Sequence, residues 1–379
     1  MQFLCKKHSP NDYLISKERI MYIFAIESSC DETSAAVLSA EGSRLEILSN
    51  IVSSQIAIHA LYGGVVPEIA SRAHCEAITN GCREAVEKAG IQFNDISAVA
   101  VTFAPGLIGS LLVGVSFAKS LASVLIVPLI PVNHIEAHVA AAYIEHSELK
   151  PPYLALVVSG GHTSLYNVSD YSEFEEIGGS RDDACGEAFD KVGRVMGLPY
   201  PGGAAMDKLA AKAFEIFDYN KKGVLSFPTP AVNDDSYDFS FSGLKTAVIN
   251  YIHNEKQKNK TDNLDEDVRC EIAGAFTKTV CDGISKKLSL ALDHTDTIYL
   301  VLAGGVAANS HLRKAVADVC KKHNVEFIVP PISLCGDNAA MTAAAGYYLF
   351  QQGITADSSL NAFASDESAE EFYCKLKAK

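Results

Sequence analysis

Two histidines spaced one helical turn apart carry the strongest chemical signal in this sequence. His134 and His138 lie four residues apart in the segment His134-Ile-Glu-Ala-His138. On a helix, residues at this spacing share one face, so both imidazoles can reach a single metal ion. The competing interpretation is an unrelated pair of surface or core histidines.

A metal site needs a third ligand, and Asp337 is a candidate. This carboxylate stands where a helix is predicted to start, but sequence spacing does not select it over other acidic residues. Two histidines and one carboxylate with open positions suit Fe(II), and Zn(II) accepts the same set. A zincin peptidase is disfavoured, because Glu136 holds the third position of the segment and the His-Glu-x-x-His pattern needs its Glu at the second.

Three turns of small residues could hold an anion. They follow predicted strands and span residues 28–34, 159–163 and 304–309. A chain without bulky side chains lets backbone N–H groups approach phosphate oxygens closely. Each turn alone is more typical of a plain tight turn, but three in matched positions of one chain favour nucleotide binding.

Charged residues gather between positions 181 and 207. Their mixture of signs is typical of a solvated helix face, which is the ordinary interpretation. Asp190 and Asp207 are the exceptions, because each lies beside a turn where a carboxylate could accept hydrogen bonds from ribose or threonine hydroxyls. The set comprises Arg181, Asp182, Asp183, Glu187, Asp190, Lys191, Arg194 and Asp207.

An internal repeat supplies the elements that would position these residues. Residues 22–37 and 153–166 both predict a strand, a turn of small polar residues and a second strand. Two such hairpins about 130 residues apart indicate a duplicated lobe. The pair Pro151-Pro152 marks the predicted boundary between the copies.

Helix and strand signals alternate after each hairpin, which predicts an α/β fold with mixed sheets. A helix is expected over 71–89, a strand over 98–103, and a buried helix followed by a strand over 110–132. In the second copy, a stripe of apolar residues every four positions from Ile272 to Leu292 predicts a long helix, and a strand follows over 297–303. A last helix is expected from Asp337 until Gly353, and the polar tail from about 357 is expected to be a short helix or frayed.

Composition excludes several classes of protein. The 379 residues suffice for about two domains, and 48% apolar and 21% charged residues are typical of a globular chain. The apolar stretch 110–132 is a poor membrane span, because it holds Lys119, Pro128 and Pro131. Ten scattered cysteines and no secretory signal favour the cytoplasm, and Met21 is a candidate start. A net charge of −14 disfavours a chain that grips nucleic acid over its whole surface.

Taken in order, the motifs resemble the Kae1/TsaD family, the universal tRNA threonylcarbamoyladenosine transferases, over about residues 22–351. Residues 180–191 are similar to the bacterial and mitochondrial branch, while Gly336 and Ala204 replace a common Thr and Pro. The motifs are Glu27-Ser-Ser-Cys-Asp-Glu-Thr33, Pro67-Glu-Ile-Ala-Ser-Arg-Ala-His74, Pro105-Gly-Leu-Ile-Gly-Ser110, Asn133-His-Ile-Glu-Ala-His138, Val157-Val-Ser-Gly-Gly-His-Thr163, Phe189-Asp-Lys191, Pro201-Gly-Gly203, Phe239-Ser-Phe-Ser-Gly-Leu-Lys245, Gly304-Gly-Val-Ala-Ala-Asn309 and Asp337-Asn338.

The resemblance implies an actin- and Hsp70-like (ASKHA) fold of two ribonuclease H-like lobes around a central cleft. The expected division is a disordered N-terminal extension at 1–20, an N-terminal lobe at 21–150, a C-terminal lobe at 151–353 and a tail at 354–379. By matched position, His134, His138 and Asp337 would hold a divalent metal, with Fe(II) expected and Zn(II) as the alternative. Asp31 and Glu32 would lie by the reacting group as the candidate catalytic carboxylates. The adenylate would contact Val157, Val158, Ser159, Gly160, Gly161, Asp190, Gly203, Asp207 and Asn309.

The implied reaction is transfer of a threonylcarbamoyl group from threonylcarbamoyl-AMP to N6 of adenosine 37 in tRNAs that read ANN codons. This forms t6A and releases AMP. The expected partners are tRNA, an upstream synthase that makes the adenylate, an inactive TsaB-like paralogue and a small TsaE-like ATPase; a mitochondrial-type relative would instead act as a homodimer. The acidic net charge favours the partnered form.

Three rival functions remain open from the residues alone. A metallopeptidase is suggested only by the two histidines. A sugar or acetate-type kinase would share the phosphate cradle on the same fold but would not need the histidine pair. A non-catalytic scaffold paralogue is disfavoured, because both histidines and all three turns are present.

Overall fold

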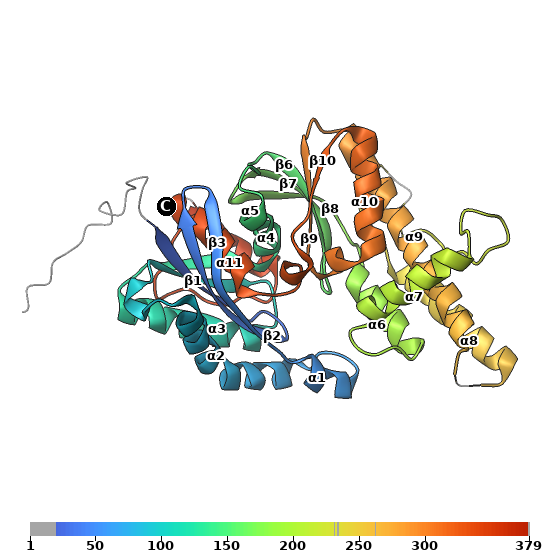
Figure 1. Cartoon of the computed structure of the whole chain (residues 1–379), viewed down its shortest axis with the longest axis horizontal. Coiled ribbons are helices and arrows are strands. Elements are labelled where there is room, and N and C mark those ends of the chain that lie inside the picture. Colours follow the sequence, from blue (N-terminus) through green and yellow to red (C-terminus); the bar gives the residue numbers. More distant parts are fainter. Residues whose placement is uncertain (1–19, 231, 233–234, 262, 378–379) are drawn as a thin grey trace, which may run out of the picture.

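The computed structural model describes residues 20–230, 232, 235–261 and 263–377. Two five-stranded sheets with helices packed on them form the described part of the chain (Figure 1). The extension predicted at 1–20 lies outside the described residues except for Ile20.

The first sheet has the strand order β3-β2-β1-β4-β5. A hairpin is extended by a third antiparallel strand on one side, and two parallel strands lie on the other. The predicted first hairpin is present, and Glu27 pairs with Ser34 at its closed end. The strands are β1 (Met21–Glu27), β2 (Glu32–Glu41), β3 (Arg44–Ser54), β4 (Ala98–Ala104) and β5 (Leu129–Asn133).

The second sheet repeats this arrangement with the order β10-β9-β6-β7-β8. Its hairpin closes where Val158 pairs with Thr163, the position matched to Glu27 and Ser34 in the first. The repeat predicted from the sequence is therefore a duplication of strand topology. The strands are β6 (Tyr153–Val158), β7 (Thr163–Asp170), β8 (Glu173–Gly179), β9 (Tyr299–Ala303) and β10 (Glu326–Ile328).

The helices of the first half pack on the first sheet or connect its strands. Two long helices pack on the sheet and on each other, one short helix follows β3, and two short helices follow β5. These helices are α1 (Ile56–His59), α2 (Pro67–Ala89), α3 (Ile108–Leu125), α4 (His134–Ala140) and α5 (Ala142–Glu145).

Five helices belong to the second half, and they extend to the right in Figure 1. The longest, α9, buries the predicted stripe that includes Ile272, Phe276 and Val280. They are α6 (Cys185–Val195), α7 (Gly202–Ile216), α8 (Ser242–Asn259), α9 (Glu266–Asp293) and α10 (Ser310–His323).

The chain then returns to the first sheet. Helix α11 (Ala339–Gln351) contacts β1, β2, β5 and α4, and it lies against the first sheet in Figure 1. The approach is close, because a Cβ added at Gly346 would lie 2.6 Å from the Cβ of Ala100. The division at 150/151 and 353/354 stays a prediction, and α11 is a part of the range 151–353 that lies against the first sheet.

The tail contains a last helix, α12 (Asp366–Lys377). Its apolar face is buried through Ala369, Tyr373 and Leu376. The sequence left open whether this tail forms a short helix, and among its described residues a packed helix is present.

Most predicted elements are present, with shifted ends. Helix α2 begins at Pro67 rather than at residue 71, because proline fits the first helical position, where its missing N–H has no partner to lose. Helix α9 begins at Glu266, six residues before the apolar stripe, and β9 begins at Tyr299 rather than at residue 297.

Within the described chain, α3 is the one helix whose length and composition would allow it to cross a membrane. It lies instead on the first sheet, where Leu111, Val115 and Ala118 are buried and where the helix contacts β4 and α2. Lys119 donates to the carbonyl of Leu360 at 3.0 Å. The buried helix predicted from the sequence is confirmed for one face only, because Leu112 and Val124 on α3 are exposed.

Candidate functional site

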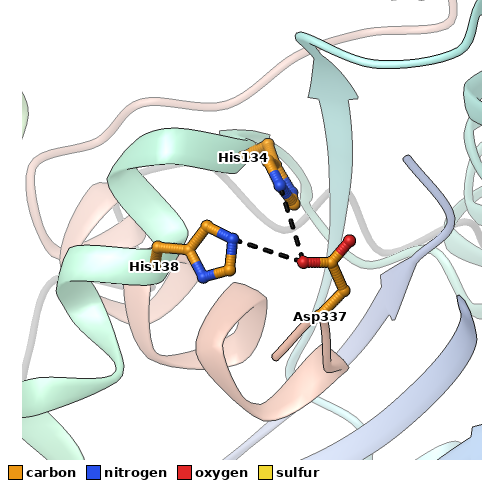
Figure 2. Close-up of side chains that lie close together, drawn as sticks. All are labelled: His134, His138 and Asp337. Atoms are coloured by element: carbon orange, nitrogen blue, oxygen red, sulfur yellow. Dashed lines mark ion pairs between the residues drawn. The ribbon is translucent and has the colours of Figure 1, made fainter. Parts of the chain in front are cut away.

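Three side chains from two distant segments meet at one point. His134 and His138 project from α4, and Asp337 lies directly before α11 (Figure 2). Asp337 Oδ1 lies 3.7 Å from His134 Nε2 and 3.3 Å from His138 Nε2. One ligand atom from each residue lies within 4.8 Å of the others. The fold therefore joins to the histidine pair the carboxylate that spacing alone could not select.

The start of α4 fixes the two histidines. Asn133 ends β5, and its side-chain oxygen accepts from the amides of Ile135 and Glu136 at 2.8 and 3.3 Å. This cap satisfies amides that have no partner within the helix. His134 is the first residue of α4 and His138 lies one turn later, so both rings leave the same face.

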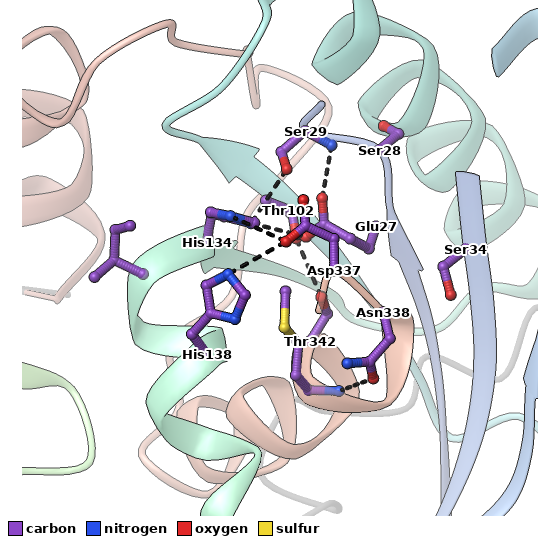
Figure 3. Close-up of polar contacts among 12 residues, drawn as sticks. Glu27, Ser28, Ser29, Ser34, Thr102, His134, His138, Asp337, Asn338 and Thr342 are labelled. Atoms are coloured by element: carbon purple, nitrogen blue, oxygen red, sulfur yellow. Dashed lines mark hydrogen bonds and ion pairs between the residues drawn. The ribbon is translucent and has the colours of Figure 1, made fainter. Parts of the chain in front are cut away.

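Asp337 is held by a similar cap. The side-chain oxygen of Asn338 accepts from the amide of Met341 at 3.1 Å, and its nitrogen donates to the carbonyl of Gly336 at 2.8 Å. The amide of Ala339 donates to Ser34 Oγ at 2.8 Å. The loop that carries Asp337 is thus fastened to β2 of the first hairpin (Figure 3).

A second layer of polar groups orients His134. Its Nδ1 lies 3.3 Å from Glu27 Oε2 and 3.2 Å from Ser29 Oγ, while its Nε2 faces Asp337. Glu27 is fully buried and accepts from Thr102 Oγ1 and the amide of Ser29, both at 2.6 Å (Figure 3). A carboxylate behind an imidazole fixes its tautomer and orientation, as is common in metal sites.

The donor set fits one divalent ion. At metal–ligand distances of about 2.0–2.2 Å, neighbouring ligand atoms are roughly 3–3.6 Å apart, close to the two separations from Asp337. Neither ring nitrogen of His138, which is 1% exposed, forms a well-aligned hydrogen bond among the described residues, although Nε2 faces Asp337 Oδ1 at 3.3 Å. A buried polar atom without a partner is costly, and an ion bound at Nε2 would remove part of that cost.

The charges of His134 and Asp337 stabilise each other. Burial acts to lower the pKa of His134, but Asp337 and Glu27 outweigh it and raise the pKa to about 9. Burial likewise acts to raise the pKa of Asp337, but His134 and His138 lower it to about 2. Asp337 is therefore an anion at neutral pH, the form in which it can bind a cation.

The predicted turn 159–161 lies next to this group. The amide of His162 donates to Ser159 Oγ at 3.1 Å and closes the hairpin between β6 and β7. Gly160 and Gly161 are exposed, and a Cβ added at either would meet no atom within 4 Å. Burial, together with the charges of His134 and His138, lowers the pKa of His162 to about 4. The glycine turn and the histidine pair thus share one electrostatic environment.

Three of the other predicted adenylate ligands hold the starts of helices in the second half. Asp190 accepts from the amide of Gly202 at 2.7 Å at the start of α7, and Gly203 follows it with open space at its Cα. Asp207 accepts from the amide and hydroxyl of Ser310, both at 3.1 Å, and Asn309 caps α10 by accepting from Leu312. Helices α7 and α10 contact each other, and helix N-termini attract anions.

The predicted carboxylates Asp31 and Glu32 lie in the turn of the first hairpin. The amide of Gln55 donates to the carbonyl of Asp31 at 2.9 Å, and Ser54 Oγ donates to Glu32 Oε1 at 3.0 Å. Burial raises the pKa of Glu32 to about 9, helped by the charges of Asp337 and Asp31. At neutral pH Glu32 therefore carries a proton.

The solvated face predicted for the charged residues between 181 and 207 is confirmed only in part, because Asp182 is exposed while both Asp182 and Asp183 also make specific tertiary contacts. Asp182 accepts from the amides of Phe241 and Ser242 at 2.7 and 3.1 Å and so holds the start of α8. Asp183 forms ion pairs with Lys191, at 3.0 Å, and with Lys245. Both side chains make tertiary contacts across about 60 residues, which charge patterning does not reveal.

Several polar residues at the site had no predicted role. Glu27, Ser29 and Thr102 surround His134, and their distance in sequence from α4 hides the connection. Burial and then the charges of Asp31 and Asp190 raise the pKa of Tyr200, so its hydroxyl stays protonated in the same electrostatic environment. A polar residue directly at the end of a buried strand, as at Glu27, is the signal by which sequence reasoning could have found this group.

Glu136 is turned away from the histidines. Its Oε2 accepts from the Tyr373 hydroxyl at 2.6 Å, on the side of α4 that faces α12. It therefore does not occupy the position of a zincin base, as the sequence predicted.

Comparison with known proteins gives a family and a fold. The family model of TsaD, tRNA N6-adenosine threonylcarbamoyltransferase, matches residues 46–344. A protein of that name from Clostridioides difficile is 49% identical over 338 residues, 89% of this chain and 96% of its own. The Clostridium novyi protein is 47% identical over 341 residues, 90% of this chain and 96% of its own.

Two solved structures of HypF share the fold. The full-length phosphate- and nucleotide-bound form has a TM-score of 0.56 and 14% identity over 89% of this chain and 47% of its own. HypF of T. kodakarensis has a TM-score of 0.59 and 14% identity over 89% of this chain and 49% of its own. The actin/Hsp70-like (ASKHA) fold predicted from the motifs is confirmed.

Proposed function

Because the chain belongs to the TsaD family of tRNA N6-adenosine threonylcarbamoyltransferases, a family of tRNA-modifying transferases, we propose that its cleft carries out this transfer with a metal-assisted site. The chain transfers a threonylcarbamoyl group to N6 of an adenosine in tRNA. The donor is threonylcarbamoyl-AMP, the acceptor is adenosine 37 in tRNAs that read ANN codons, and the products are t6A and AMP.

The observation that carries the proposed site is the convergence of two sets of groups. His134, His138 and Asp337 form a compact cation site, and His162, which follows the glycine turn, interacts electrostatically with all three. Asp190, which holds the start of α7, interacts in the same way with Asp31 of the first hairpin. An adenylate combines an anionic phosphate with an activated carbonyl. Amides and helix N-termini suit the phosphate, and a cation suits the oxygen that gains charge.

In the proposed reaction the N6 amine attacks the carbamoyl carbon, the new N–C bond forms, and the bond from that carbon to the phosphate oxygen breaks. The amide groups of Gly160 and Gly161 hold the phosphate, while Asp190, Asp207 and Asn309 keep the surrounding helix starts in place. Asp31 accepts the proton that N6 loses, because Glu32 already carries one. Because the donor is activated, positioning supplies much of the acceleration.

The ion held by His134, His138 and Asp337 is proposed to be Fe(II), with Zn(II) as the alternative. When bound, it polarises the carbonyl or steadies the departing phosphate. Glu27 keeps His134 Nε2 directed at the ion by occupying Nδ1.

The proposed partners are tRNA, an upstream synthase for the adenylate, an inactive TsaB-like paralogue and a small TsaE-like ATPase, all in the cytoplasm. The net charge of −14 supports a composite tRNA surface, because a chain this acidic needs basic partners to neutralise phosphates.

Transfer of labelled threonine into unmodified tRNA tests the function. The assay contains a purified synthase, ATP, bicarbonate, the partner proteins and this chain. Label should appear with the wild-type chain and fall about 100-fold or more with His134→Ala or Asp337→Ala, as when an electrostatic contact to the transition state is lost. Unchanged transfer by both variants would refute the metal site, and no transfer by the wild type would refute the donor and partners proposed.

A further inference from the structure

Residues at the start and in the last turns of helix α12 bind the segment that carries the two histidines, which consists of Asn133 and helix α4. At its start, Asp366 Oδ1 accepts from Asn133 Nδ2 at 2.6 Å. Two turns later, the Tyr373 hydroxyl donates to Glu136 Oε2 at 2.6 Å, and Lys377 Nζ lies 3.5 Å from Glu136 Oε1. Residues more than 220 positions away in sequence thus bind Asn133, the N-cap of α4, and Glu136, the residue of α4 that is polar and not a proposed ligand.

The contact with Asp366 decides which way the amide of Asn133 faces. The cap of α4 requires the oxygen of this amide to face Ile135 and Glu136, and the nitrogen must then face elsewhere. An ionised carboxylate only accepts hydrogen bonds, so Asp366 selects the amide nitrogen and leaves the oxygen for the cap. The first turn of α4, which begins with His134, is fixed as a result.

The contact with Tyr373 fixes the rotation of α4 about its axis. Glu136 lies two residues from each histidine, and two residues correspond to about 200° around a helix, so its side chain leaves the face opposite the ligands. Glu136 is 7% exposed, and its carboxylate would be costly to bury without the Tyr373 hydroxyl and the Lys377 ammonium. Turning α4 away from its present orientation would break both contacts.

Helix α12 is itself held by aromatic packing and by a hydrogen bond. The ring of Tyr373 packs 5.3 Å from that of Phe103 on β4, and Phe372 packs 6.1 Å from the same ring. Lys377 also donates to the carbonyl of Ser172, between β7 and β8 of the second sheet. The helix therefore bridges both sheets while it holds α4.

We propose that α12 is a positioning element for the cation site, and that Tyr373 and Asp366 maintain the affinity for the ion by fixing the orientation of α4. This inference rests on the proposed site at His134, His138 and Asp337. Neither Tyr373 nor Asp366 touches the ion; each acts through a residue of α4.

Zinc affinity of the full chain tests this inference without any tRNA reaction. A chromophoric chelator competes for Zn(II) with the metal-free protein, and the dissociation constant is compared between variants. Tyr373→Phe keeps the ring against Phe103 but removes the hydroxyl, and it should raise the Zn(II) dissociation constant about tenfold, at the low end of the range for outer-shell changes. Asp366→Ala should act alike, whereas Asp366→Asn keeps an acceptor oxygen for Asn133 and should restore an affinity near that of the wild type.

The matched control is Tyr347→Phe. This variant also removes a hydroxyl from a buried tyrosine. In the wild type that hydroxyl donates to the carbonyl of Gly42 at 2.7 Å, at the end of the first hairpin opposite Glu27 and Ser34. Tyr347→Phe should lower thermal stability by a similar amount and leave the zinc affinity unchanged. Equal affinity in Tyr373→Phe, Asp366→Ala and the wild type would overturn the role of α12 alone. A wild-type chain that binds no Zn(II) or Fe(II) would overturn the proposed site as well.

Discussion

At the scale of single residues, the candidate site depends on groups that do not touch the ion. Glu27 is fully buried and lies behind His134, where the facing ring lowers the pKa of the carboxyl against the effect of burial, which acts to raise it. Ser29 and Thr102 satisfy the same carboxylate, so Glu27 has one orientation available. The imidazole is in turn held with Nε2 towards Asp337.

Glu27→Gln should therefore weaken metal binding without removing a ligand. The substituted amide presents a nitrogen donor where Nδ1–H of His134 needs an acceptor, and outer-shell changes of this kind reduce metal affinity by about 10- to 100-fold. Competition with a zinc chelator measures the change. Glu46→Gln, on the outer part of β3, is the control and should leave the affinity unaltered; an unchanged constant in Glu27→Gln would show that His134 keeps its orientation unaided.

His74 predicts a pH dependence of stability. It accepts from Thr33 through Nδ1 at 2.7 Å and donates through Nε2 to the carbonyl of Cys30 at 3.0 Å, and burial lowers its pKa below the usual 6.5. The unfolded chain thus takes up a proton near pH 6.5 while folded His74 stays neutral. Its contribution to stability is complete above that pH and falls as the pH decreases, by up to about 1.4 kcal/mol per pH unit.

Urea unfolding at pH 7.5 and 5.5 measures this dependence. The wild type should lose more stability between the two values than His74→Gln, in which no titrating ring remains. The exposed His253, changed to Gln, controls for the loss of any histidine, and an equal pH dependence in His74→Gln and the wild type would contradict the prediction.

At the scale of elements, the glycine turn depends on how closely α6 approaches it. The amide of Gly186 donates to the carbonyl of Ser159 at 3.2 Å, and a Cβ at Gly186 would lie 2.5 Å from that carbonyl oxygen. Backbone atoms cannot move aside as a flexible side chain does. The start of α6 and the turn therefore have to separate if position 186 carries a side chain.

Gly186→Ala should destabilise the chain by about 1–3 kcal/mol, the usual cost of overpacking. Gly81→Ala is the matched control, because Gly81 lies inside α2 with no atom within 4 Å of an added Cβ, and alanine there should stabilise by roughly 0.5–1 kcal/mol. Thermal unfolding of both variants measures whether each substitution lowers or raises the stability of the chain. A stable Gly186→Ala would mean that the turn adjusts without cost.

Sequence patterns predicted which helices and strands form better than they predicted which of them pack together. The two hairpins were evident, because apolar β-forming runs flank turns of small residues, and the helix with both histidines was evident from their spacing. The place of α11 was not, because it follows the second sheet in sequence and only tertiary packing returns it to the first. The role of α12 was equally hidden, since its sequence is polar and its contacts with Asn133 and Glu136 span more than 230 residues.

At the scale of the whole molecule, the two sheets repeat one topology, but a helix that follows the second sheet in sequence packs on the first. Helix α11 supplies buried residues such as Met341 and Tyr347 to the core built around β1 and β4, although it is made after the second sheet. Tyr348 stacks on Tyr171 of the second half with ring centroids 4.0 Å apart. The core of the first half is thus completed by α11, which follows the second sheet in sequence.

A fragment of residues 20–150 should accordingly fail to fold alone. Without α11, apolar faces of β1, β2 and β5 would be exposed to water, which costs about 25 cal/mol for each Å² left uncovered. Circular dichroism during urea titration should show no cooperative transition for this fragment, in contrast to the whole chain. A sharp transition in the fragment would show that the first sheet is stable without its last helix.

The position of Asp337 also sets an order of events during synthesis. His138 and Asp337 are 199 residues apart in the chain, since 337 − 138 = 199. At about 5–20 residues per second, the ribosome needs roughly 10–40 seconds to pass from one to the other. During that interval the growing chain carries the two imidazoles but not Asp337, so the proposed site can form only after this residue has been made.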